Sequence, residues 1–185
     1  MAGLKLEIAQ DRPFASIEEE ALLNLLRTSD HLSRAFHLRT REWGITSTQY
    51  NVLRILRGAH PKGLACSAIG SRMITAEPDI TRLLARLKAL KLIRQHRDAG
   101  DRRTVLTEIS EAGLELLKEM DPVILRLPKE LLEGLNRADL IELIRLLELA
   151  RGSDSEPPAQ SMTKKQRATA PSASAQQEPH RHRSG

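Results

Sequence analysis

Apolar and polar positions near the start of the chain follow a helical period and predict one unusually long helix. Ser16 and Glu19 have the spacing of a capping box, and apolar residues then recur at helical intervals to about Trp43, where Gly44 ends the pattern. Most globular helices are shorter, so we expect this one to extend beyond its own domain. The segment before it, residues 1–15, is expected to be a flexible arm.

Two shorter helices are expected next. Thr46 and Gln49 form a second capping box, which predicts a helix that stops near Gly58 and Pro61. A short helix follows over about residues 67–73.

The next helix, expected over about residues 76–91 and opened by Thr75, has two contrasting faces. Its apolar face consists of Ile80, Leu83, Leu84, Leu87 and Leu90. Its opposite face consists of Pro78, Thr81, Arg82, Ala85, Arg86 and Ala89. Small residues around two arginines suit either plain solvation or the close approach of another surface, and the pattern of this helix alone leaves both open.

A charged hairpin follows this helix. Residues 92–97 and 104–109 read as two short strands, joined by residues 98–101 with Gly100 at the tip. Ser110 then caps a helix over about residues 111–120.

The C-terminal part is expected to hold two further apolar segments and a tail. Asp121 and Pro122 predict a break, and a shorter apolar segment precedes Asn136, which with Asp139 caps a last helix. From residue 152 to residue 185 the composition changes to Ser, Ala, Pro and Gln, which predicts a disordered tail.

The order of these elements predicts the fold class: mainly α (α+β), a winged helix-turn-helix at about residues 45–110 with a two-stranded wing. In this motif the third short helix enters the DNA major groove, while the hairpin reaches the neighbouring backbone or minor groove.

Charge along the chain agrees with that prediction. The net charge is +5, and within residues 72–103 nine Lys and Arg face four Asp and Glu, whereas residues 104–151 carry six against ten. A basic middle with an acidic flank is expected if the middle faces a polyanion. Aromatic residues are too scarce for the ring platforms of single-strand binders.

The predicted DNA-contacting residues fall into two groups. On and before the third helix, Arg82 and Arg86 can bind guanine edges or phosphates, and Thr81 keeps the helix near the groove floor. Arg103 of the hairpin suits a narrow minor groove, and Asp101 is expected to hold its guanidinium by charge-assisted hydrogen bonds. The full predicted set is Thr75, Pro78, Thr81, Arg82, Arg86, Arg97, Asp101, Arg102 and Arg103.

At these residues the sequence resembles the MarR family of bacterial transcriptional regulators. Asp101-Arg102-Arg103 followed by Ile109-Ser110-Glu111-Ala112-Gly113 looks like the wing and next helix of the family, and Ile80-Thr81-Arg82-Leu83 with Arg86-Leu87 looks like its recognition helix. The resemblance covers about residues 16–151.

The resemblance implies a homodimeric repressor. Helices over about residues 16–43 and 111–151 would interlace between two chains, and the DNA-binding lobes would bind a pseudo-palindromic operator. It also implies a small aromatic or phenolic effector that binds between the dimer region and the DNA-binding lobe and releases the operator.

Two other functions remain open, protein binding and redox sensing, whereas metal binding and enzyme activity fit the sequence poorly. The fold could instead bind protein, although Arg82 and Arg86 oppose an apolar or acidic docking face, and Cys66 could make the chain a redox-sensing regulator. His and Cys residues lack metal-ligand spacing, and the sequence shows no phosphate-binding or nucleophile motif. We therefore expect the protein to bind no metal or cofactor and to have no enzyme activity.

The single cysteine and the apolar pattern also bear on location. One cysteine allows no internal disulfide, and no apolar run is long enough to span a membrane. With no signal-peptide pattern at the start, we expect a cytoplasmic protein that binds no membrane.

Overall fold

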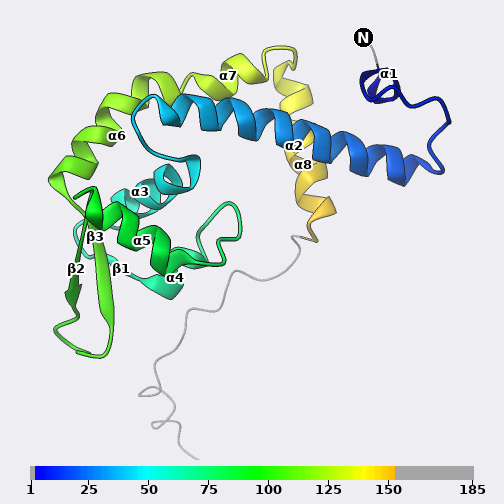
Figure 1. Cartoon of the computed structure of the whole chain (residues 1–185). Helices are drawn as coiled ribbons and strands as arrows, with labels where there is room; N and C mark the ends of the chain where they lie inside the picture. The colour runs from blue at the N-terminus through cyan, green and yellow to red at the C-terminus, as the bar shows by residue number, and fades with distance from the viewer. Residues whose placement is uncertain (1–2, 153–185) are drawn as a thin grey trace, which may run out of the picture. The chain divides into compact units, whose positions relative to one another are not determined.

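The computed structural model describes residues 3–152, which form eight helices and a three-stranded sheet (Figure 1). The predicted tail from residue 152 falls, apart from its first residue, outside the described part of the chain. The chain divides into two compact units, residues 1–133 and residues 134–185.

The first unit contains the predicted winged helix-turn-helix. Its elements are α3 (Ser47–Ala59), β1 (Leu64–Ala65), α4 (Cys66–Gly70), α5 (Ile80–Ala89), β2 (Ile93–Arg97) and β3 (Val105–Ile109). The sheet is antiparallel with strand order β1-β3-β2, and β2 pairs with β3 from Ile93 opposite Ile109 to Arg97 opposite Val105. The expected two-stranded wing thus gains a third strand, whose two residues are too few to give a periodic signal.

The helical periodicity of the sequence corresponds to a buried core. Leu53 and Leu56 of α3, Leu87 of α5 and Leu117 of the following helix are fully buried in one cluster. Burying each such side chain contributes about 1.5–3 kcal/mol to the free energy of folding, so these positions hold the helices and the sheet together. Leu90, expected on the same face, is the C-cap of α5 and is 49% exposed.

The long first helix is confirmed as α2 (Ile17–Arg41). Ser16 caps it by accepting a hydrogen bond from the Glu19 backbone N–H at 3.2 Å, while the Glu19 carboxylate accepts from the N–H of Ala15. A short helix that the sequence did not predict, α1 (Leu4–Glu7), precedes it, and Leu4 is buried.

The start of α5 differs from the prediction. The helix begins at Ile80, and Asp79 is its N-cap, accepting from the Arg82 backbone N–H at 2.9 Å. Thr75 is therefore not the cap, and residues 71–79 form an irregular loop between α4 and α5, which we call the recognition loop. An ionised carboxylate at the N-cap bonds a free N–H and favours the positive end of the helix dipole, so Asp79 starts the helix.

Pro122 does not break the next helix, contrary to expectation. α6 runs through it, from Glu111 to Ile124, and α7 follows (Leu127–Leu131). Pro122 lies in the last turn, where its missing N–H costs one bond, and its carbonyl accepts from Arg126 Nε at 2.8 Å. Asp121 beside it bonds to α3, which also holds the turn in place.

The described part of the second unit is one helix, α8 (Arg137–Ala150). The predicted capping box between Asn136 and Asp139 is complete, with both reciprocal bonds formed. Hydrogen bonding to the Arg145 guanidinium lowers the pKa of Glu142 below its ordinary value. None of the α8 residues is buried. Within residues 3–152 no helix combines the length and apolar character needed to cross a bilayer.

Candidate nucleic-acid interface

The candidate recognition helix, α5, separates apolar and cationic side chains as predicted. Leu83, Leu84 and Leu87 are buried, whereas Thr81, Arg82 and Arg86 are exposed. No other group within residues 3–152 forms a hydrogen bond or ion pair with the guanidinium of either arginine. Both remain available for an external anion or base edge.

The recognition loop places the other two predicted residues of this group before the helix. Thr75 and Pro78 are both exposed. Glu77 supports the cap, because its carboxylate accepts from the Asp79 backbone N–H at 3.3 Å. Thr75 and Pro78 therefore lie on irregular backbone and not on the outward face of α5.

In the wing, Asp101 has a different role from the predicted one. Its carboxylate accepts from the Arg103 backbone N–H and the Thr104 hydroxyl, each at 3.0 Å, and forms no ion pair with the Arg103 guanidinium. An Asp side chain that bonds the backbone two residues on is a common way to fix a turn. Asp101 thus shapes the loop, and the Arg103 guanidinium has no partner in the described part of the chain.

Arg97 also stabilises the hairpin. Its Nη1 donates to the Arg102 carbonyl at 2.9 Å, and the Asp98 N–H donates to the Thr104 carbonyl at 2.9 Å. These bonds close the loop beyond the last strand pair and leave the guanidinium groups of Arg102 and Arg103 exposed. Figure 1 shows the β2–β3 hairpin projecting beside α5 and away from α6. The winged helix-turn-helix therefore presents cationic groups on both α5 and the β2–β3 hairpin.

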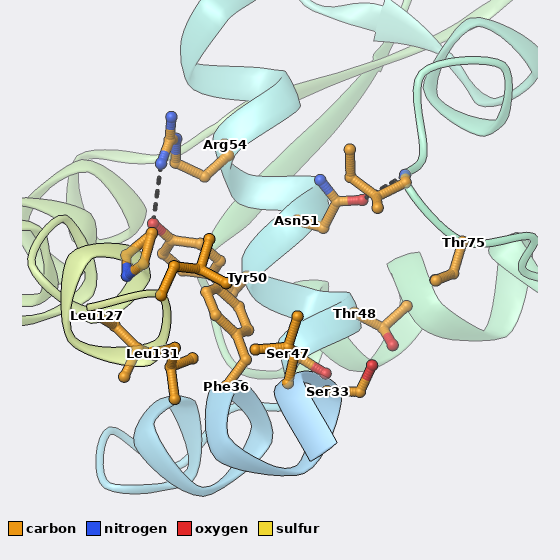
Figure 2. A pocket seen from close by; sticks show the side chains of 14 residues that line it. Ser33, Phe36, Ser47, Thr48, Tyr50, Asn51, Arg54, Thr75, Leu127 and Leu131 are labelled. Carbon is orange, nitrogen blue, oxygen red and sulfur yellow. Dashed lines mark hydrogen bonds between the residues drawn. The ribbon is translucent and has the colours of Figure 1, made fainter. Parts of the chain in front are cut away.

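A pocket of about 550 Å³ lies between α2, α3, the recognition loop and α7 (Figure 2). Apolar and hydroxyl side chains dominate its lining, and Arg54 is the one charged residue among them in the described chain. Arg54 Nη1 donates to the Tyr50 hydroxyl at 3.0 Å, and Arg54 Cζ lies 5.8 Å from the centre of the Tyr50 ring. The rings of Phe36 and Tyr50 meet edge-on, with 5.5 Å between the ring centres. The pocket thus combines aromatic walls with one cation.

The family resemblance implies an effector site between the dimer region and the DNA-binding lobe, but the sequence did not reveal which residues line this pocket, because they come from four separate segments. One of its residues, Asn51, accepts a hydrogen bond from the Ile74 backbone N–H at 3.0 Å (Figure 2). The available signal was an asparagine inside a helix, where this residue is unfavourable. Thr75, predicted for DNA contact, also lines the pocket.

Cys66 and the histidines add little to this picture. Cys66 is the first residue of α4 and is exposed as a free thiol. Among residues 3–152, no group of His, Cys, Asp and Glu side chains has the arrangement of a metal site.

Comparison with known proteins identifies the family. The MarR family model matches residues 43–104, which contain α3 to the wing loop. The transcriptional repressor NicR of Pseudomonas putida is 30% identical over 110 residues, 60% of this chain and 68% of the relative. A MarR transcription factor from Planctomyces limnophilus is 38% identical, with a TM-score of 0.57 over 74% of this chain and 99% of its own.

A third similar protein is BpsR of Bordetella bronchiseptica, whose DNA binding is regulated by 6-hydroxynicotinic acid. Its structure is 25% identical, with a TM-score of 0.66 over 78% of this chain and 100% of its own. The fold and the cationic lobe define a winged helix-turn-helix transcriptional regulator. The chain belongs to the MarR family.

Proposed function

We propose that this protein is a repressor that binds double-stranded DNA in a sequence-specific manner. The observation that carries the proposal is that the guanidinium groups of Arg82 and Arg86, on the outward face of α5 and beside an arginine-bearing wing, have no partner among residues 3–152. Arginine forks on a helix match the acceptors of guanine in the major groove, and Arg102 and Arg103 can bind phosphates or a narrow minor groove. The similarity to the repressor NicR supports the direction of regulation.

The predicted DNA-contacting set is kept, with the roles of two members changed. Thr75, Pro78, Thr81, Arg82, Arg86, Arg102 and Arg103 are proposed to contact the duplex. Asp101 and Arg97 are proposed to act indirectly, since their bonds shape the loop that carries Arg102 and Arg103.

We further propose that the protein acts as a homodimer. The amino-terminal half of α2 and all of α8 expose more apolar surface than an isolated helix tolerates in water: Ile17, Leu22, Leu25, Leu26, Ile141, Ile144, Leu146 and Leu149. A second copy of the chain would bury these side chains. A two-fold dimer predicts a pseudo-palindromic operator with half-sites roughly 10 base pairs apart.

An aromatic or phenolic effector is proposed for the pocket. Phe36 and Tyr50 offer ring contacts, and Arg54 and the hydroxyl-bearing residues offer polar ones. Regulation of BpsR DNA binding by 6-hydroxynicotinic acid, an aromatic compound, supports this class of ligand. An occupant between α2 and α3 would change the position of the DNA-binding lobe and weaken operator binding.

Fluorescence anisotropy with labelled duplexes tests the proposal. The purified protein should bind a mixed-sequence duplex more weakly as salt rises, because each neutralised phosphate releases counterions. The double variant Arg82→Ala, Arg86→Ala should lose most of this affinity while keeping the far-ultraviolet circular dichroism of the wild type. Equal affinity of wild type and variant would refute the role of α5, and light scattering on the same samples determines whether the protein is dimeric.

A further inference from the structure

One side chain of α3 holds the loop that precedes α5. Asn51 Oδ1 accepts from the Ile74 N–H at 3.0 Å, and no other side-chain hydrogen bond in residues 3–152 joins α3 to the recognition loop. Asparagine is a poor residue inside a helix, because its side chain competes for backbone bonds and lowers helix propensity relative to alanine. Here the side chain bonds to a neighbouring segment, which explains its presence at this position.

The bond matters because the side chain of Ile74 does not anchor the loop. Ile74 is 85% exposed, so its own side chain adds little burial; Met73 before it packs against the core, and the Asn51 bond holds the backbone just beyond that contact. Thr75 and Pro78 follow in the same loop, and Asp79 then caps α5. The Asn51 bond therefore constrains the backbone at the start of the segment that leads from Ile74 to the recognition helix.

The same bond borders the pocket. Asn51, Ile74 and Thr75 all line it (Figure 2), so both partners of the hydrogen bond face any molecule that occupies the cavity. An occupant that bonds to the Asn51 amide or presses on the Ile74 backbone competes with the Asn51–Ile74 contact.

We propose that Asn51 is a positioning residue for DNA binding, through which occupancy of the pocket reaches α5. The inference rests on the DNA-binding function proposed above, but Asn51 itself does not contact DNA. With an empty pocket the bond holds the recognition loop for operator binding. With the pocket filled, the bond breaks and the loop moves.

Asn51→Ala and Asn51→Asp test the positioning role, with Gln10→Ala as control, because Gln10 likewise bonds a backbone group but lies outside the DNA-binding lobe. Amide hydrogen exchange is measured at Ile74 and, as reference, at Leu53 in the α3 core. We expect Asn51→Ala to speed amide exchange in the recognition loop alone. Operator affinity should weaken roughly 3- to 10-fold, which corresponds to the net free energy of one hydrogen bond.

Asn51→Asp keeps the acceptor oxygen, so slow exchange at Ile74 should persist. Unchanged exchange at Ile74 in Asn51→Ala would overturn the proposal, and so would equal acceleration at Leu53, which indicates general destabilisation. These measurements need no DNA. If the wild type bound no duplex, the proposed function would fail while the exchange data still decided the role of Asn51.

A covalent occupant tests the link to the pocket. Ser33 lines the pocket and is exposed, so Ser33→Cys in a Cys66→Ser background can be labelled to completion with N-phenylmaleimide, as mass spectrometry verifies. The adduct should speed Ile74 exchange and weaken operator binding, and it should add little to either effect when Asn51→Ala is also present. Unchanged Ile74 exchange in the adduct would overturn the link.

Discussion

The guanidinium of Arg57 on α3 forms two hydrogen bonds with the carboxylate of Asp121 on α6, at 2.8 and 3.2 Å. Both side chains are about 30% exposed, so water screens the pair only in part. Bidentate geometry makes such a contact stronger than an ordinary surface ion pair. The pair attaches the first helix of the DNA-binding lobe to the helix that follows the wing.

Removing either partner should therefore destabilise the protein. We expect Arg57→Ala and Asp121→Asn each to lower the free energy of unfolding by about 1–2 kcal/mol. Urea denaturation of both variants and of the double variant measures the coupling. Because the two residues share one interaction, the double variant should lose less than the sum of the single losses, and simple additivity would show that the contact contributes nothing.

Gly113 is expected to tolerate no larger residue. A Cβ at this position would meet the Leu92 carbonyl oxygen and lie 2.7 Å from Cγ1 of Ile109, so Gly113→Ala should cost about 1–3 kcal/mol by overpacking. Gly58 of α3 has nothing within 4 Å of such a Cβ, and Gly58→Ala should instead stabilise by about 0.5–1 kcal/mol. Thermal unfolding should show a lower melting temperature for Gly113→Ala and a higher one for Gly58→Ala. Equal shifts in melting temperature for the two variants would contradict the role of packing at Gly113.

Local signals in the sequence predicted most helix starts. Ser16, Thr46, Ser110 and Asn136 all accept the expected cap bonds, because capping depends on residues only three positions apart. The secondary-structure prediction was wrong where tertiary contacts determine whether an element forms or continues. β1 exists only by pairing with β3, and α6 continues through Pro122, where bonds from Arg57 and Arg126 hold the last turn.

The candidate site was predictable only in part. The two faces of α5 follow from periodicity, so the exposure of Arg82 and Arg86 was correctly predicted. Asp101 was wrongly assigned to the Arg103 guanidinium, since sequence spacing does not distinguish a side-chain partner from a backbone one. The pocket requires knowledge of which distant segments meet, and no periodic pattern carries that information.

Arg82 is predicted to read bases. Arg82→Ala should lose about 1–3 kcal/mol of discrimination at one operator position, if its guanidinium bonds a guanine in bidentate fashion. Anisotropy with the operator and with duplexes substituted at single positions measures this loss. If the variant and the wild type had the same base preference at every operator position, Arg82 would have no role in reading bases.

Arg103 is predicted to bind the backbone or minor groove. Arg103→Ala should weaken binding to all sequences alike and reduce the slope of log affinity against log salt by about 1. The matched control is Arg12→Ala, which removes the same charge from an exposed residue before α2. Identical salt slopes for the two variants would show that the wing does not contact the duplex.

The most direct test of the whole account is in vitro selection from a random duplex DNA pool with the full-length protein. We expect enrichment of a pseudo-palindrome whose half-sites lie roughly 10 base pairs apart, bound by a dimer and lost in the Arg82→Ala, Arg86→Ala variant. A pool that stays random at low salt, or an enriched site that the variant binds equally well, would contradict it.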